Sequence, residues 1–153
     1  MYLLKRTTSA NIDFQHLVTL LDNDLQIRDG DEHSFYEQFN KIDSIKNVVV
    51  YYEENEPIAC GAFKEWQPSI AEIKRMFVKP EHRSKGIASI ILKELEYWAT
   101  EMGYTACVLE TGIKQPEAIR LYTKNNYVIT PNFGQYENVE NSVCMKKELI
   151  RQN

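Results

Sequence analysis

The spacing of apolar side chains predicts two long helices in the chain. Over residues 87–102 the apolar stripe consists of Ile87, Ile91, Leu95, Trp98 and Met102. Steps of three and four positions place such side chains on one face of an α-helix, and Gly103 follows where glycine commonly ends a helix. A second stripe over residues 12–25 predicts an earlier helix, with Ser9 or Asn11 as its N-terminal cap.

Shorter patterns complete the predicted order of elements. A third helix is expected from Pro116 to about Asn125, since proline is tolerated in the first turn of a helix, and a short helix is expected around residues 34–39. Strands are expected at Tyr2–Thr7, Val48–Tyr52, Ile58–Phe63, Ile70–Val78, Thr105–Glu110, Tyr127–Thr130 and Ser142–Leu149. The sequence therefore predicts a single α/β domain over residues 1–153, with a mixed sheet flanked by helices.

Composition excludes several classes of protein. The 153 residues include 18 Lys and Arg against 22 Asp and Glu, a net charge of −4, which rules out a domain-wide basic surface for nucleic acid or anionic lipid. No apolar run reaches the roughly 18 residues that cross a bilayer, and the N-terminal apolar run is too short for a signal peptide. The cysteines, Cys60, Cys107 and Cys144, form no Cys-x-x-Cys pair, and no spacing suggests a metal site. We therefore expect a reduced, cytoplasmic chain without a metal.

A candidate phosphate site lies where a strand, a short turn and a long helix follow one another. The helix is expected to open near Ser84, with the small residues Gly86 and Ala88 in its first turn. A helix N-terminus has unpaired backbone N–H groups and the positive end of the helix dipole, and small side chains let an anion approach them. Arg83 and Lys85 add positive charge at the rim. Neither a Gly-x-Gly-x-x-Gly fingerprint nor a P-loop is present.

Two blocks of sequence carry a family resemblance. Residues 83–88 read Arg-Ser-Lys-Gly-Ile-Ala, five positions after Val78, and residues 115–127 read Gln-Pro-Glu-Ala-Ile-Arg-Leu-Tyr-Thr-Lys-Asn-Asn-Tyr. The first resembles the Gln/Arg-x-x-Gly-x-Gly/Ala signature of the GNAT superfamily, the acetyl-CoA-dependent N-acetyltransferases. The second resembles that family's Asn-x-x-Ala-x-x-Leu-Tyr-x-x-x-Gly-Phe/Tyr block, with Gln115 in place of Asn and Asn126 in place of Gly. The resemblance implies the GNAT fold across nearly the whole chain.

The resemblance also implies how acetyl-CoA binds and what it does. The family transfers the acetyl group directly to an amine, here of a small molecule or peptide. Backbone groups of Met76, Phe77 and Val78 would pair with the pantetheine arm, and one N–H would polarise the thioester carbonyl. The diphosphate would lie on Arg83, Ser84, Lys85, Gly86, Ile87, Ala88 and Ser89, and Gln115 would contact the pantetheine arm.

Catalytic candidates follow from the same resemblance. Tyr122 matches the family's general acid, which protonates the CoA thiolate as it leaves, and the alternative is a tyrosine that only packs. Glu72 lies six residues before Val78, the offset of the catalytic base in the histone-acetyltransferase branch. The alternative for this glutamate is a structural pair with Lys74. A β-bulge in the strand would change where Glu72 points, Glu110 is a second candidate base, and family precedent allows no dedicated base.

The acceptor is the least defined part of the prediction. Five acidic residues, Asp22, Asp24, Asp29, Asp31 and Glu32, are opposed only by Arg28. They would attract a cationic amine, or they form a solvated loop. Glu65, Trp66 and Tyr136 are further candidates for the acceptor pocket, and the aromatic segment 132–137 suits either a site wall or a homodimer contact. A CoA-binding regulatory module without turnover and a purely structural interaction domain remain as alternative functions.

Overall fold

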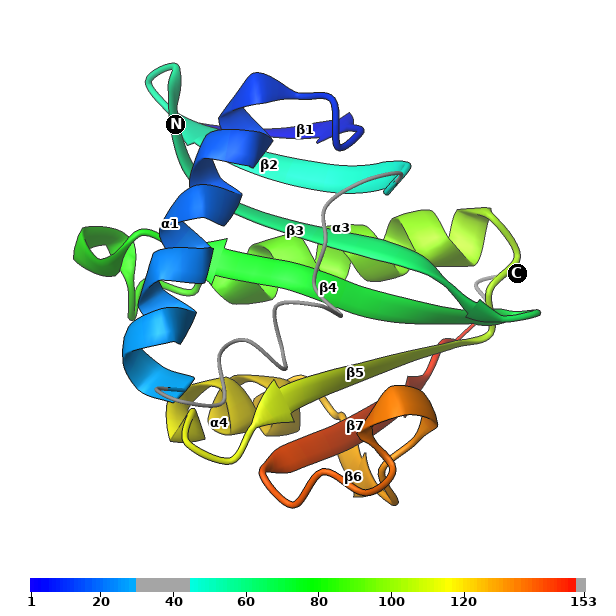
Figure 1. Cartoon of the computed structure of the whole chain (residues 1–153). Coiled ribbons are helices and arrows are strands. Elements are labelled where there is room, and N and C mark those ends of the chain that lie inside the picture. Colours follow the sequence, from blue (N-terminus) through cyan, green and yellow to red (C-terminus); the bar gives the residue numbers. More distant parts are fainter. Residues whose placement is uncertain (30–44, 151–153) are drawn as a thin grey trace.

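The computed structural model describes residues 1–29 and 45–150, which form one mixed sheet with helices on both faces (Figure 1). Seven strands run in the order β1-β2-β3-β4-β5-β7-β6. The strands are β1 (Tyr2–Thr7), β2 (Asn47–Glu53), β3 (Glu56–Gln67), β4 (Ile70–Val78), β5 (Ala106–Gly112), β6 (Val128–Thr130) and β7 (Ser142–Glu148). The helices are α1 (Ile12–Asp29), α3 (Ile87–Glu101) and α4 (Pro116–Lys124), with 3-10 turns at Pro80–His82 and Gly134–Tyr136.

The predicted elements agree with this architecture, and the differences lie at their ends. The bounds of β1 and β4 match the prediction, whereas β3 is longer at both ends than the predicted 58–63. The helix cap is Asn11, whose side-chain oxygen accepts a hydrogen bond from the Phe14 N–H at 2.9 Å. The short helix expected around residues 34–39 lies outside the described residues, as do Asp31 and Glu32. Among the described residues, no helix is long and apolar enough to span a membrane.

The two faces of the sheet have separate hydrophobic cores. In β2, Val48 and Val50 pack with α1, while Val49 and Tyr51 belong to the core under α3. Successive strand residues point to opposite faces, so a strand that is covered on both faces is apolar along its length. Cys107 lies in the core under α3 and Cys60 in the core with α1, and Cys144 is also a buried free thiol.

The sheet opens between β4 and β5. These strands are parallel and pair only at one end, where Ile70, Ala71 and Glu72 face Ala106, Cys107 and Val108. Figure 1 shows the strands diverging from that point, with α1 and α4 near the open end. In the described part of the chain, β4 therefore has no strand partner on this side beyond Glu72, and its edge is available to a ligand.

A β-bulge, which the sequence analysis considered for this strand, interrupts β4 at the same opening. Cys60 of β3 pairs with Phe77 and Ala62 pairs with Lys74, so two residues of β4 lie opposite Gly61. One of them, Arg75, has a φ of 61°. A methyl group on Gly61 would lie 2.5 Å from the Met76 sulfur, so this glycine is needed for the close approach of the bulged strand.

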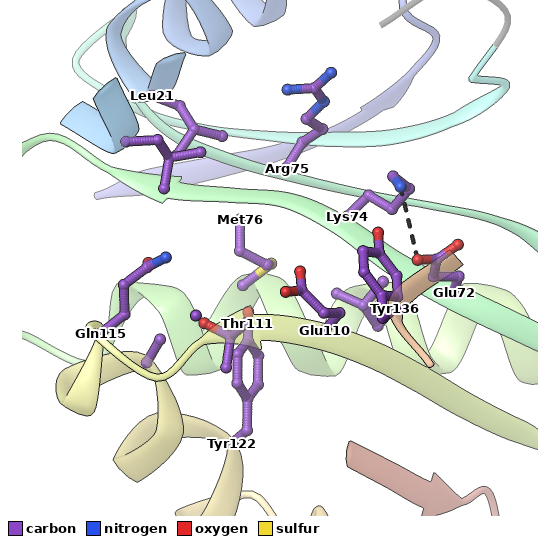
Figure 2. Close-up of a pocket in the computed structure, with 14 residues that line it drawn as sticks. Leu21, Glu72, Lys74, Arg75, Met76, Glu110, Thr111, Gln115, Tyr122 and Tyr136 are labelled. Atoms are coloured by element: carbon purple, nitrogen blue, oxygen red, sulfur yellow. Dashed lines mark ion pairs between the residues drawn. The ribbon is translucent and has the colours of Figure 1, made fainter. Parts of the chain in front are cut away.

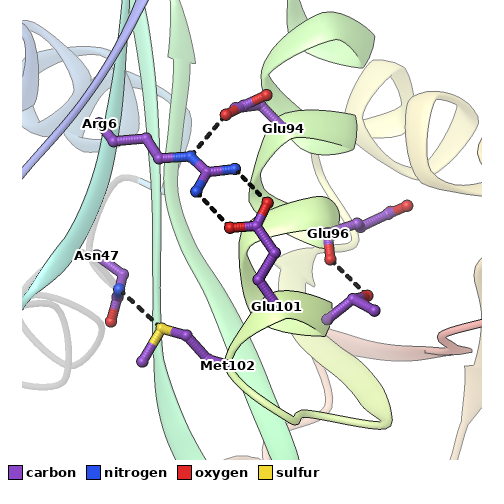
Figure 3. A network of polar contacts seen from close by, with 7 residues as sticks. Arg6, Asn47, Glu94, Glu96, Glu101 and Met102 are labelled. Atoms are coloured by element: carbon purple, nitrogen blue, oxygen red, sulfur yellow. Dashed lines mark hydrogen bonds and ion pairs between the residues drawn. The ribbon is translucent and has the colours of Figure 1, made fainter. Parts of the chain in front are cut away.

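An ion-pair network joins the edge strand β1 to α3 (Figure 3). Arg6 Nε lies 2.7 Å from Glu94, and Arg6 Nη1 lies 2.8 Å from Glu101. These contacts raise the pKa of Arg6 and lower that of Glu101, since each group stabilises the charged form of its partner. The guanidinium also lies 5.0 Å from the centroid of the Trp98 ring. We refer to Arg6, Glu94 and Glu101 as the surface network.

Candidate active site

A cleft of about 480 Å³ lies between the end of β4, the start of α3 and α4. Its lining contains all the predicted cofactor residues except Lys85, whose side chain is exposed outside the cleft. The lining residues from that prediction are Met76, Phe77, Val78, Arg83, Ser84, Gly86, Ile87, Ala88, Ser89 and Gln115. The contact of Lys85 with the diphosphate therefore stays a prediction.

Helix α3 begins at Ile87, three residues later than expected, and Gly86 is its N-terminal cap. Ser84 and Gly86 both have positive φ values, 66° and 80°. Glycine adopts this conformation freely and serine rarely does, so the sequence carried no signal that the turn extends past Ser84. No side chain caps the helix, and a methyl group on Gly86 would meet nothing within 4 Å. The first N–H groups of α3 are therefore open to an anion.

Neighbouring polar groups hold this helix start in place. Arg83 donates from Nε to the Val78 carbonyl at 2.8 Å and from Nη2 to Asp24 at 3.4 Å. Its charge at the rim is thus shared with a carboxylate of α1. On the other side of the cleft, the Asn125 amide donates to the Ser89 hydroxyl at 3.1 Å, which ties the end of α4 to the first turn of α3.

A second cavity of about 120 Å³ lies at the opening between β4 and β5 (Figure 2). Its polar lining comes from β4 (Glu72, Lys74, Arg75), β5 (Glu110, Thr111), α4 (Tyr122) and the 3-10 turn with Tyr136. We call it the polar cavity. Five residues line both this cavity and the cleft: Leu21, Met76, Gln115, Ala118 and Tyr122. The two spaces therefore adjoin at Met76 and Tyr122.

The carboxylates of the polar cavity are held by partners. Glu72 is 2% exposed and lies 3.6 Å from the Lys74 ammonium. Glu72 thus lines the cavity and forms the ion pair with Lys74 that the sequence suggested, while its role as a base stays a prediction. Burial lowers the pKa of Lys74, because the charged form loses hydration. Glu110 accepts a hydrogen bond from the Ser142 hydroxyl at 2.7 Å.

Tyr122 is buried at the junction of the two spaces. Its ring packs edge to face on Tyr127, with centroids 5.8 Å apart. Burial raises the pKa of the Tyr122 phenol, and the nearby charge of Glu110 raises it further. The phenol is therefore protonated at neutral pH and has a proton to donate.

The predicted acceptor residues are only partly brought together. Tyr136 lines the polar cavity, whereas Glu65 and Trp66 line neither the cavity nor the cleft, and their place in an acceptor pocket stays a prediction. The Trp66 ring instead packs on the Phe133 ring, with centroids 4.9 Å apart, and the Phe133 ring packs on the Tyr136 ring, with centroids 5.8 Å apart. Trp66 and Phe133 therefore support the ring of Tyr136, which lines the polar cavity.

The fold adds basic partners to the acidic segment, within which Arg28 is the only Lys or Arg. Asp22 and Asp24 lie on α1, and each faces an arginine distant in sequence. Asp22 is 3.3 Å from Arg75, and Asp24 is 3.4 Å from Arg83, because the fold brings β4 and its following turn against α1. Arg75 is the cavity residue that the sequence analysis missed.

Comparison with known proteins places these features in a family. A model of the Acetyltransferase (GNAT) family matches residues 14–127. The chain belongs to the GNAT family. An IAA acetyltransferase of Azospirillum brasilense is 36% identical over 93 residues, which cover 60% of this chain and 61% of that protein. The chain thus matches about three-fifths of that relative's length.

Solved structures agree with the GNAT assignment. A protein from Klebsiella pneumoniae proposed to be an acyl-CoA N-acyltransferase has a TM-score of 0.82 and 26% identity, covering 98% of this chain and 99% of its own. The PaiA N-acetyltransferase of Thermoplasma acidophilum, solved in complex with coenzyme A, has a TM-score of 0.72 and 16% identity, covering 97% of this chain and 99% of its own. Among the described residues of this GNAT protein, no cluster of three or more His, Cys, Asp or Glu side chains is arranged to hold a metal ion.

Proposed function

We propose that this GNAT protein transfers an acetyl group from acetyl-CoA directly to a primary amine of a small molecule or peptide. The observation that carries the proposal is the junction at Met76 and Tyr122, where an anion-binding cleft adjoins a polar cavity. A cleft alone would suit a protein that only binds CoA. A second space with two carboxylates and a protonated phenol suits a second substrate.

The cleft fits the chemistry of acetyl-CoA. The open N–H groups from Gly86 to Ser89 suit the diphosphate, since a helix N-terminus favours anions. The unpaired edge of β4 at Met76–Val78 suits the amide groups of the pantetheine arm, which would bind as an additional strand. Gln115 lines both spaces and is placed to contact the arm near its thioester end. The coenzyme A in the PaiA structure supports the same ligand here.

The polar cavity fits the steps of acetyl transfer. A primary alkylamine has a pKa of about 10.4 and is protonated at neutral pH, so Glu72 or Glu110 accepts its proton directly or through water. The amine nitrogen then forms a bond to the thioester carbonyl carbon. As the carbon–sulfur bond breaks, Tyr122 donates its proton to the leaving thiolate. The nitrogen loses its second proton as the amide forms, and a proton returns to the Tyr122 oxygen through solvent. The products are the acetylated amine and CoA.

Acetyl-CoA binding by calorimetry, followed by thiol release against a panel of amines, tests the proposal. Cys60, Cys107 and Cys144 are buried, and burial raises the pKa of the Cys144 thiol to about 11, so a thiol reagent reports CoA in the folded protein. Micromolar binding with release for some amines is expected. Binding without release for any amine would favour the CoA-binding regulatory module, and absence of binding would contradict both. The free thiols also support a reducing, cytoplasmic setting.

A further inference from the structure

We propose that the acceptor carries a carboxylate beside its amine, as a free amino acid does, and that Arg75 binds this carboxylate. The inference rests on the proposed acetyl transfer and names the class of amine. It follows from an incompletely paired guanidinium at the polar cavity, where Arg75 lies among residues from β4, β5 and α4.

The Arg75 side chain is buried yet only partly paired. It is 2% exposed, and its ion pair with Asp22 is formed by Nη1 at 3.3 Å. The Nε–H group is buried and has no hydrogen-bond partner in the structure. Buried polar groups in folded proteins nearly always have partners, because an unpaired donor loses its hydration without replacement. Because Arg75 lines the polar cavity, its unpaired Nε–H points to an acceptor atom that a ligand supplies.

The backbone at Arg75 supports a role beyond packing. Its φ of 61° lies in the left-handed region, which an arginine adopts only at a cost. The bulge that contains it displaces the pairing with β3 by one residue. Figure 2 shows the guanidinium above β4, on the same side as Leu21 of α1. Strained residues gather at functional sites, where the strain sets the direction of a side chain.

The chemistry of the free edge favours a carboxylate. Nη1 is engaged by Asp22, while Nε belongs to the other edge of the guanidinium. That edge forms parallel hydrogen bonds with the two oxygens of a carboxylate. Asp22 is 43% exposed and is a weak competitor for the charge of Arg75, since much of it faces water.

The charges and the volume of the polar cavity further define the class of acceptor. Glu72 and Glu110 supply negative charge for the amine, and Arg75 supplies positive charge for the carboxylate, so one cavity presents both signs. Its 120 Å³ holds about four water molecules at about 30 Å³ each. That space suits a small zwitterion.

Matched pairs of acceptors test the inference without any mutation. Each free amino acid is compared with its primary carboxamide, and kcat/KM is measured by thiol release across pH to separate amine basicity from recognition. We expect the free acid of at least one pair to be preferred by about tenfold or more, the typical effect of a hydrogen bond to a charged group. Equal or better use of the amide in every pair would overturn the role of Arg75 and leave acetyl transfer intact.

Variants then locate the effect. Arg75→Gln is expected to remove the preference by raising KM for the acid, with the acetyl-CoA affinity unchanged as a check that the cleft is folded. Arg6→Gln makes the same chemical change in the surface network and should keep the preference. A preference that survives in folded Arg75→Gln would contradict the inference. If no amine is acetylated, the proposed function fails, and calorimetry with the same pairs still decides: tighter binding of the acid supports Arg75, and equal or absent binding overturns it.

Discussion

Two arginines of this protein contrast sharply in their surroundings. Arg6 is 32% exposed and forms ion pairs of 2.7 and 2.8 Å with Glu94 and Glu101. Arg75 is 2% exposed, has one ion pair of 3.3 Å with Asp22, and keeps a buried Nε–H without a partner. Arg75 is the more deeply buried of the two arginines, yet it forms fewer ion pairs than Arg6. The surface network thus links β1 to α3, whereas the Arg75 guanidinium keeps an unpaired N–H donor for a ligand.

Burial by itself does not explain the difference. Glu96 is also buried, and it accepts hydrogen bonds from the Tyr127 hydroxyl at 3.0 Å and the Lys147 ammonium at 2.7 Å. This protein therefore satisfies buried ionic groups where they serve the core. Among the described residues, two buried side-chain nitrogens have no hydrogen-bond partner, Arg75 Nε and His82 Nδ1, and each of these residues lines one of the two adjoining spaces.

The largest expected effect is on turnover and concerns Tyr122, at the junction of the cleft and the polar cavity. Tyr122→Phe removes the proton donor while keeping the packing, so kcat should fall by about a hundredfold or more, with little change in acetyl-CoA affinity. Tyr127→Phe is the matched control, since this neighbouring buried phenol lines neither the cleft nor the polar cavity. Thiol release and calorimetry measure both quantities. Unchanged turnover in Tyr122→Phe would refute the acid role.

The next effect tests whether the open helix start of α3 binds the diphosphate. Gly86→Glu places a negative charge at the cleft and should weaken acetyl-CoA binding by on the order of a hundredfold, because like charges meet there. Gly103→Glu is the control, since Gly103 also has a positive φ and open space around it but lies after α3. Both variants carry similar backbone strain. If calorimetry finds equal losses of acetyl-CoA affinity in both variants, the start of α3 does not bind the diphosphate.

The buried contacts of Glu96 with Tyr127 and Lys147 should affect the free energy of unfolding and not the acetyl transfer. Glu96→Ala leaves Lys147 and the Tyr127 hydroxyl without their partner and should lower the free energy of unfolding by about 3 kcal/mol. Acetyl-CoA affinity of the folded variant should stay close to that of the wild type. Urea unfolding monitored by circular dichroism measures the change, and a loss below the error of the method would show that water replaces Glu96.

The smallest effect is expected at the surface network. Arg6→Gln should lower Tm by at most about 3 °C, since exposed ion pairs contribute little. The pKa of Glu101 is lowered below its ordinary value of 4.5 by Arg6. A lowered carboxylate pKa stabilises the fold above 4.5, and this contribution fades as the pH falls through the folded-state value. The Tm difference between wild type and variant should therefore shrink in acid, and a constant difference from pH 7 to pH 3 would exclude the ion pair as its cause.

Local patterns predicted much of the fold because they act over short distances along the chain. The stripe that begins at Ile87, the cap at Asn11 and the strand Ile70–Val78 depend on periodicity and on side chain to backbone contacts within a few residues. Asn126, which stands in place of the family glycine, is a similar case: its φ of 74° is a left-handed conformation that asparagine tolerates better than most residues. Such features need no knowledge of distant partners.

The sequence was least informative where the path of a turn or a distant residue decides how a side chain lies. Lys85 lies inside the motif, but left-handed residues precede and follow it in the turn, and the lining of the cleft does not include it. Trp66 is a candidate for the acceptor pocket, and in the structure it packs on Phe133. The direction of a loop side chain depends on backbone angles that residue type leaves open.

The amino-acid sequence by itself determined the order of the elements, the family and the segment at which a phosphate group would bind, because these follow from local periodicity and from a motif. Only the tertiary structure decided that the cleft and the polar cavity adjoin at Tyr122, that Asp22 and Asp24 face arginines, and that Arg75 is buried with an unpaired donor. Burial and pairing are properties of groups that meet across long sequence separations. They arise only once β4 and β5 diverge against α1 and α4, and it is these properties that suggest the acceptor.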